Sequence, residues 1–171
     1  CGRDSFKSGA QHFLTALYNQ EDWQRRFIGY KDYKKRENYM LVKKFRIRKN
    51  IEHAYAYICG PGYSELYINN SKIGDNVLEP GWTDYNRRVL YSVYDVTENI
   101  QKGANLISVM LGEGWLGHEH TFFMKIFGTN PSWLGTPCLL MNLLLFYSDG
   151  TTETIYTDEG LKWYAAKGPV I

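Results

Sequence analysis

The sequence is built from short runs in which apolar and polar residues alternate and which end at turn residues. Successive side chains of a β-strand point to opposite faces, so such a run indicates a strand with one buried and one solvated face. In residues 41–48, for example, Phe45 and Ile47 alternate with Lys44 and Arg46. The pattern predicts seven or eight strands, seven of them over residues 41–48, 54–59, 65–69, 89–96, 106–111, 139–147 and 152–157.

Two tight hairpins are predicted from turn residues. Asn70 and Ser71 follow one run, and Asn tolerates a positive φ better than most residues that carry a Cβ. Ser148-Asp149-Gly150 separates the last two runs and carries the strongest hairpin signal in the chain. Each predicted hairpin joins two consecutive strands, which are therefore expected to be antiparallel.

Helical signals are weak. Residues 11–27 have a helix-like stretch in which Phe13 and Leu17 would share a face. Asp95 predicts the cap of a short helical turn that ends near Gly103.

These elements predict an all-β fold, an antiparallel sandwich or barrel, and exclude a parallel α/β fold. The composition agrees, because aromatic residues favour strands and make up 16% of the 171 residues. The length fits about one domain. The longest apolar run, residues 138–147, has about half the length of a membrane-spanning helix.

Charge and cysteine content exclude several classes of function. Lys and Arg dominate residues 1–50, whereas Asp and Glu dominate the rest, and the net charge is only +2. The basic stretch 31–49 suggests nucleic acid, but alternation places many of its charges on a solvated strand face, so no nucleic-acid partner is predicted. Cys1, Cys59 and Cys138 are too few and too far apart for a disulfide framework, and the latter two are predicted to be core residues.

Two loops rich in Gly and Trp, residues 74–85 and 112–120, are the candidate binding elements. An exposed aromatic ring can stack on the C–H face of a pyranose, while carboxylates and amides bond its hydroxyls. We therefore predict carbohydrate contact at these loops, with the alternative that Trp82 and Trp115 only plug the core. The predicted substrate-binding residues are Asp75, Asn76, Trp82, Tyr85, Glu113 and Trp115.

Metal and cofactor motifs are incomplete. His118 and His120 loosely resemble the first metal motif of cupins, but Met124 and Lys125 stand where that motif has Glu. Calcium is a candidate ion for Asp75, Glu79, Asp84 and Glu113, which lack the spacing of a known loop. A GxGxxG pattern over residues 112–117 follows a strand without opening a helix, so it is interpreted as a loop.

Taken in order, many motifs resemble one family, the amino-terminal β-sandwich domain of bacterial α-L-rhamnosidases (glycoside hydrolase family 78). The resemblance runs from about residue 41 to the end of the chain, with Asn70 where the family has Gly and Leu116 where it has an aromatic residue. It is carried by Tyr63-Ser64-Glu65-Leu66-Tyr67-Ile68-Asn69, Ile73-Gly74-Asp75, Pro80-Gly81-Trp82-Thr83, Tyr94-Asp95-Val96-Thr97 and Leu111-Gly112-Glu113-Gly114-Trp115.

The resemblance implies a jelly-roll sandwich like a carbohydrate-binding module, within an enzyme that releases terminal L-rhamnose from plant glycosides or pectic polymers. It implies that residues 1–19 end a preceding fibronectin-like module and that residues 20–171 form the sandwich. The catalytic carboxylates of such enzymes lie on a downstream (α/α) barrel, so we expect this segment alone to be inactive and to contact an L-rhamnose-containing glycan. The alternatives are a structural spacer packed on the barrel and, less favoured, a cupin-type metalloenzyme.

Overall fold

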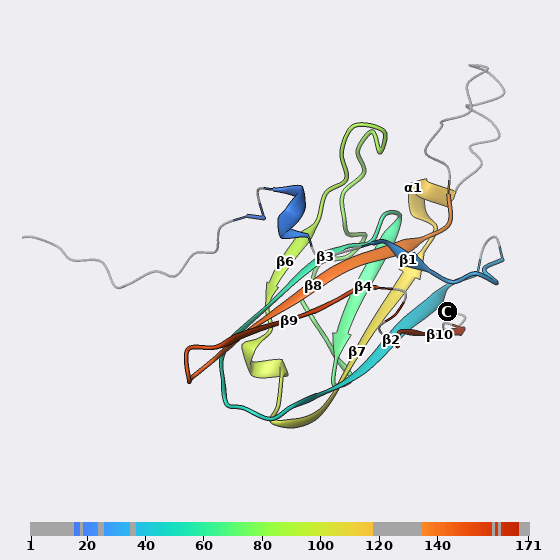
Figure 1. Cartoon of the computed structure of the whole chain (residues 1–171). Coiled ribbons are helices and arrows are strands. Elements are labelled where there is room, and N and C mark those ends of the chain that lie inside the picture. Colours follow the sequence, from blue (N-terminus) through green and yellow to red (C-terminus); the bar gives the residue numbers. More distant parts are fainter. Residues whose placement is uncertain are drawn as a thin grey trace, which may run out of the picture.

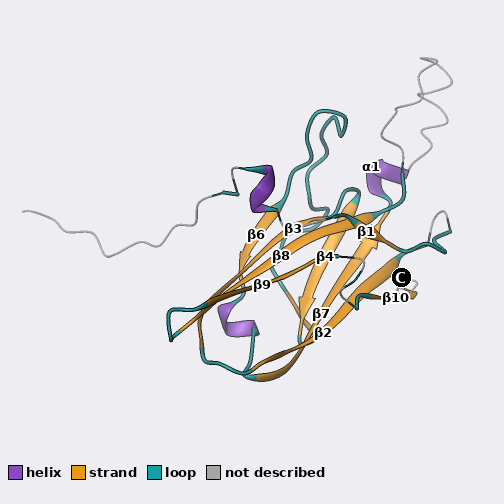
Figure 2. Ribbon diagram, viewed as in Figure 1, coloured by secondary structure: helices purple, strands orange, loops and turns teal. Residues whose placement is uncertain are grey.

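In the computed structural model, two antiparallel β-sheets face each other (Figures 1 and 2). The structure describes residues 16–17, 19–23, 26–34, 37–117, 135–158, 160 and 162–167. The first sheet has the order β1-β8-β3-β6, with β9 also paired to β8. Its strands are β1 (Ile28–Gly29), β3 (Ile51–Cys59), β6 (Ser92–Asp95), β8 (Cys138–Tyr147) and β9 (Thr152–Tyr156).

The second sheet has the order β10-β2-β7-β4-β5. Its strands are β2 (Tyr39–Ile47), β4 (Tyr63–Ile68), β5 (Ser71–Lys72), β7 (Gly103–Gly112) and β10 (Tyr164–Lys167). The described helical elements are single turns, namely η1 (Gln20–Asp22), η2 (Thr97–Asn99) and α1 (Gly114–Gly117). None of the helices in the described part of the chain is long and apolar enough to cross a membrane.

The core lies between the sheets and follows the period-two pattern of the sequence. In β7, Ile107, Val109 and Leu111 are fully buried, and the residues between them are partly exposed. Leu143 and Leu145 of β8 meet them from the opposite sheet as part of one apolar cluster. The predicted antiparallel sandwich is therefore confirmed.

Two strands and two helical elements differ from the predictions. β1 is only two residues long, and all four residues of β10 are exposed, so neither carries an alternating signal. The helix predicted over residues 11–27 is wrong where the structure describes that stretch, which holds only the three-residue η1. α1 is a four-residue helical turn where a loop was expected.

Leu17, Asp22 and Trp23, which precede β1, contact residues of the first sheet and of the segment that leads into β6. Trp23 contacts Tyr57 and Tyr91 edge-on, with ring centroids 6.5 and 5.0 Å away. The buried Asn142 side chain donates to the Asp22 carbonyl at 3.1 Å, and Leu17 N–H donates to the Tyr91 hydroxyl at 3.2 Å. These contacts hold the three residues against the sandwich, and no pattern in the sequence around them predicts this placement.

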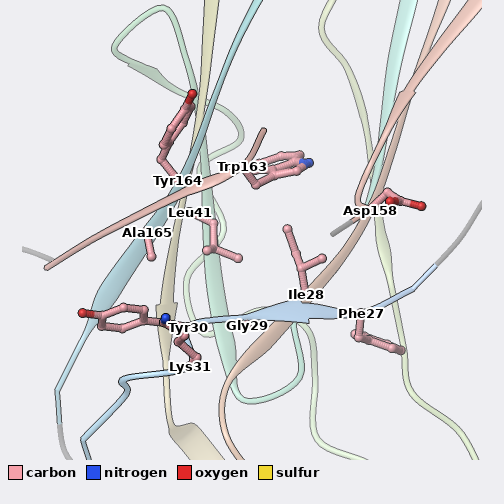
Figure 3. Close-up of a pocket in the computed structure, with 10 residues that line it drawn as sticks. All are labelled: Phe27, Ile28, Gly29, Tyr30, Lys31, Leu41, Asp158, Trp163, Tyr164 and Ala165. Carbon is pink, nitrogen blue, oxygen red and sulfur yellow. The ribbon is translucent and has the colours of Figure 1, made fainter. Parts of the chain in front are cut away.

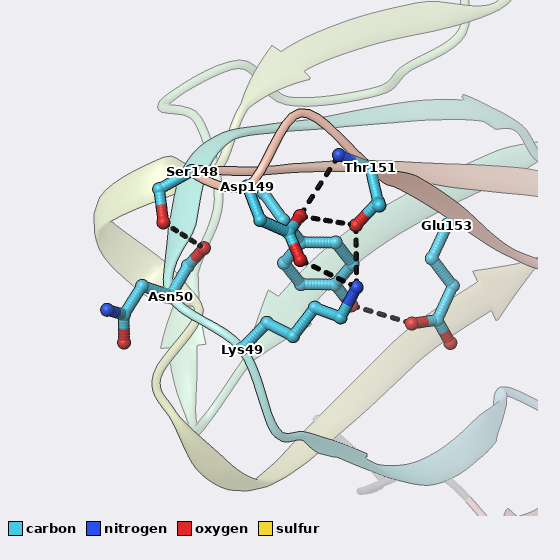
Figure 4. A network of polar contacts seen from close by, with 7 residues as sticks. Lys49, Asn50, Ser148, Asp149, Thr151 and Glu153 are labelled. Atoms are coloured by element: carbon cyan, nitrogen blue, oxygen red, sulfur yellow. Dashed lines mark hydrogen bonds and ion pairs between the residues drawn. The ribbon is translucent and has the colours of Figure 1, made fainter.

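Both predicted hairpins are present. Asn69 and Asn70 form the β4–β5 turn with φ values of 50° and 68°, one residue earlier than predicted. Two successive positive φ values fit the tight turn that matches strand twist. In the β8–β9 hairpin, Lys49 Nζ lies 2.8 Å from Asp149, whose carboxylate also accepts from Thr151 (Figure 4).

This ion pair predicts a pH dependence of stability. The bonds from Lys49 and Thr151 hold the pKa of Asp149 well below its usual range. A depressed pKa stabilises the fold above the carboxyl's unfolded pKa of about 3.9. We expect the stability advantage of the wild type over Asp149→Asn to be present at neutral pH and to be lost progressively as the pH falls below about 4. Urea midpoints along a pH series would measure it, and a gap that widened in acid would contradict it.

Candidate functional site

The first predicted binding loop and the described part of the second, residues 112–117, lie at the same end of the sandwich (Figure 1). The first joins β5 to β6, and the second follows β7 and includes α1. The first loop leaves β5 at the edge of the second sheet and the second leaves β7 at its centre, so this sheet places both loops.

Glu79 organises the first loop. Its carboxylate accepts hydrogen bonds from the hydroxyls of Tyr94 and Ser92 and, at 2.8 Å, from the Asn76 amide. Its backbone carbonyl accepts from Ser64 N–H at 2.7 Å. Burial, with the bond to Glu79, raises the pKa of Tyr94 to about 12, so the hydroxyl stays a donor at physiological pH. One residue thus ties the loop to β4 through its backbone and to β6 through its side chain.

Asp75 and Asn76 lie beside this anchor. Both side chains are exposed, and Asn76 uses one amide proton to bond Glu79. Asp75 makes no hydrogen bond to another described residue, and its charge acts on Tyr94 and Lys72. Adjacent residues of the loop therefore expose a carboxylate and an amide to solvent.

Trp82 is 55% exposed, so it does not plug the core. Its neighbours in the loop are also unusually apolar for a surface, with Val77 at 68% and Leu78 at 62% exposure. Leu78 has a φ of 61°, which costs a residue with a Cβ on the order of 1 kcal/mol or more. The side chain of Trp115 lies outside the described residues, so its predicted role is untested.

Tyr85 and Glu113 meet at Gly62. The Tyr85 hydroxyl accepts from Gly62 N–H at 3.5 Å, and Gly62 lies directly against the carbonyls of Gly112 and Glu113. The Glu113 carboxylate accepts from the Tyr33 hydroxyl. The structure therefore joins the second loop to the end of the first, although residues 62, 85 and 113 are far apart in the sequence.

The acids proposed for calcium do not gather. Asp84 pairs with Arg87 at 3.4 Å and accepts from Asn86 N–H, while Glu79 and Glu113 are bonded as described above. In the described part of the chain, no three His, Cys, Asp or Glu side chains form a group that could hold a metal ion. These residues do not fit the predicted calcium site.

Two pairs of residues remain as candidates for metal binding or nucleophilic catalysis, a histidine pair and a cysteine pair. His118 and His120 lie outside the described residues. Cys59 is the last residue of β3 and Cys138 is the first residue of β8. Burial raises the pKa of their thiols to about 12 and about 11. Both thiols are therefore protonated at neutral pH, which disfavours nucleophilic catalysis. Cys59 is buried as predicted, whereas Cys138 is only partly buried.

Comparison with known proteins shows which protein family this β-sandwich belongs to. The family model of the α-L-rhamnosidase N-terminal domain matches residues 49–171. The chain therefore belongs to the α-L-rhamnosidase N-terminal domain family, which confirms the resemblance of its motifs.

The relatives are full enzymes. An α-L-rhamnosidase of Formosa agariphila is 33% identical over 75% of this chain, and one of Streptomyces avermitilis is 36% identical over 77%. The structure of α-L-rhamnosidase from Dictyoglumus thermophilum superposes with a TM-score of 0.75 at 38% identity and covers 91% of the chain. The chain spans only 13%, 12% and 18% of these three proteins.

The first prediction from this geometry concerns Glu79, whose anchoring role sequence reasoning missed. We expect Glu79→Gln to loosen the loop, because the amide replaces an acceptor-only carboxylate that serves three donors. Faster amide hydrogen exchange over residues 75–91, with unchanged exchange in β7, would show it. Unchanged exchange in the loop would contradict the anchor.

Proposed function

We propose that this chain is the accessory sandwich of an α-L-rhamnosidase and that its first loop contacts the rhamnose-containing glycan. The observation that carries the proposal is the exposed Trp82 on the loop that also presents Asp75 and Asn76. An indole face suits the C–H face of a pyranose, and the carboxylate and amide suit its hydroxyls.

The anchor at Glu79 supports this proposal energetically. A loop that is already held by Tyr94, Ser92 and Ser64 loses little conformational entropy when a sugar binds. Tyr85 and Glu113 take a supporting part, since both bond to protein groups that join the two loops.

Hydrolysis is assigned to another part of the parent enzyme. A glycosidase needs an acid and a second carboxylate placed across the scissile bond. Glu79 and Glu113 instead hold loops in place. The length of the relatives supports a downstream catalytic region, which we expect to be the (α/α) barrel, with residues 1–19 belonging to a preceding module.

Calorimetric titration of the chain with methyl α-L-rhamnoside tests the loop. We expect millimolar binding in the wild type and a loss of about tenfold, ~1.4 kcal/mol, in Trp82→Ala or Asp75→Ala. Val93→Ala, an exposed apolar residue of β6, is the matched control and should bind normally.

Repeating the sugar titration in buffer with calcium and in buffer with EDTA shows whether sugar binding requires a metal ion. A wild type that stays silent at high millimolar sugar in both buffers would contradict the proposal. The domain would then serve only as a spacer packed on the barrel.

A further inference from the structure

A groove opens at the edge of the sandwich where β1 of one sheet faces β10 of the other (Figure 3). Its volume is about 570 Å³, within the range of small-ligand sites. Figure 3 shows Trp163, Leu41 and Ile28 bordering one space, with Asp158 to one side. This groove is separate from the two loops, since none of its lining residues belongs to them.

The floor of the groove is apolar. Ile28 and Leu41 are 7% and 3% exposed, so they expose only a small apolar surface there. Phe27 and Tyr164 flank them and are 44% and 59% exposed. Exposed rings beside a preformed hollow are uncommon on a surface that touches nothing, and they favour a ligand.

The indole of Trp163 is fixed before any ligand arrives. Its N–H donates to the Tyr156 carbonyl at 3.2 Å, and the Lys43 ammonium lies 5.6 Å from the ring centroid. Two contacts therefore set the ring's orientation, so stacking a flat ligand on it costs little ordering entropy.

Asp158 and Lys31 bring charged groups to the lining of the groove. One oxygen of Asp158 accepts from Gly160 N–H at 2.7 Å, and the other has no partner among the described residues. Lys31 also lines the groove with an exposed side chain. An open acceptor and a cationic donor above an apolar floor disfavour both a phosphate, which Asp158 repels, and a wholly apolar ligand.

We propose that this groove is a second carbohydrate site, which binds a 6-deoxyhexopyranose unit of a glycan. The ring lies against Trp163, the methyl group points to Ile28 and Leu41, and the hydroxyls bond to Asp158 and Lys31. A hexose would instead bury its C6 hydroxyl against side chains that offer it no hydrogen bond, and that desolvation weakens binding. The assignment rests on the proposed function for the kind of glycan but uses a different set of residues.

Two glycosides that differ at one atom test the groove on the full 171-residue chain. Methyl α-L-rhamnoside and methyl α-L-mannoside are alike except for the hydroxyl on C6. We expect the rhamnoside to shift the indole N–H resonance of Trp163, assigned with Trp163→Phe, and the mannoside to bind at least about tenfold more weakly. Asp158→Ala should lower the affinity for the rhamnoside. Glu98→Ala, which removes an exposed carboxylate outside the groove, should leave that affinity unchanged.

The outcomes separate the groove from the loop. If Trp82→Ala abolishes all binding and Trp163 never responds, the groove proposal is overturned and the loop proposal stands. A Trp163 response that survives Trp82→Ala supports the groove even if the loop fails. Equal affinity for the two glycosides, or an unaffected Asp158→Ala variant, would overturn the deoxyhexose assignment.

Discussion

Replacing Gly62 by alanine is expected to destabilise the domain by about 3 kcal/mol, because strain and a backbone clash add. Gly62 has a φ of +94°, and a methyl group there would lie 2.4 Å from the Gly112 carbonyl oxygen and 2.6 Å from that of Glu113. Both contacts are with backbone, so β7 and the turn after it would have to move. The melting temperature should fall by about 6–12 °C, which calorimetry measures.

Gly150→Ala is the matched control. Gly150 also has a positive φ, +78°, but no heavy atom lies within 4 Å of the position that the alanine methyl group would take. It carries the conformational cost without the clash, so its loss of stability should be roughly 1 kcal/mol. Equal effects of the two substitutions would show that Gly62 does not hold the two loops together.

Asn105→Ala should cost a similar amount, about 3 kcal/mol, because it removes a buried side chain together with all of its hydrogen bonds. Asn105 is 4% exposed. Its amide donates to the Gln101 carbonyl at 2.7 Å, and its oxygen accepts from Gln101 N–H and from the Asn69 amide, both at 2.9 Å. Urea unfolding followed by fluorescence would measure the loss.

Gln101→Ala provides the comparison for this network. Its side chain is exposed and donates only to the Ala104 carbonyl among the described residues, so we expect a change within about 0.5 kcal/mol. A mild effect of Asn105→Ala would mean that water replaces the lost bonds at the β4–β7 junction.

The fold could be predicted from sequence wherever burial alternates. β7 and β8 have one face in the core, and their apolar residues mark it. β10 could not be predicted, because Tyr164 to Lys167 are exposed on both faces and the strand is held by backbone pairing with β2. The helix assigned near residues 11–27 failed for a related reason, since Trp23 packs on Tyr57 and Tyr91 rather than along a helix face.

The site could be predicted in part. Gly and Pro around Trp82 indicate a turn rather than a strand, which left this residue either exposed or plugging the core, and the structure shows it exposed. The anchoring role of Glu79 depends on Tyr94 and Ser92, which lie on the next strand, so no local pattern reveals it. The groove was missed entirely because its walls come from β1, β2 and β10, which are distant in the sequence.

β1 and β10 are also the first and last strands of the described chain, and they belong to different sheets. A sugar bound between them would contact both the strand by which the chain enters the sandwich and the strand by which it leaves. Its presence would stiffen the angle between whatever precedes the sandwich and whatever follows it. Glycan capture could then be converted into orientation of neighbouring modules without any rearrangement of the strands themselves.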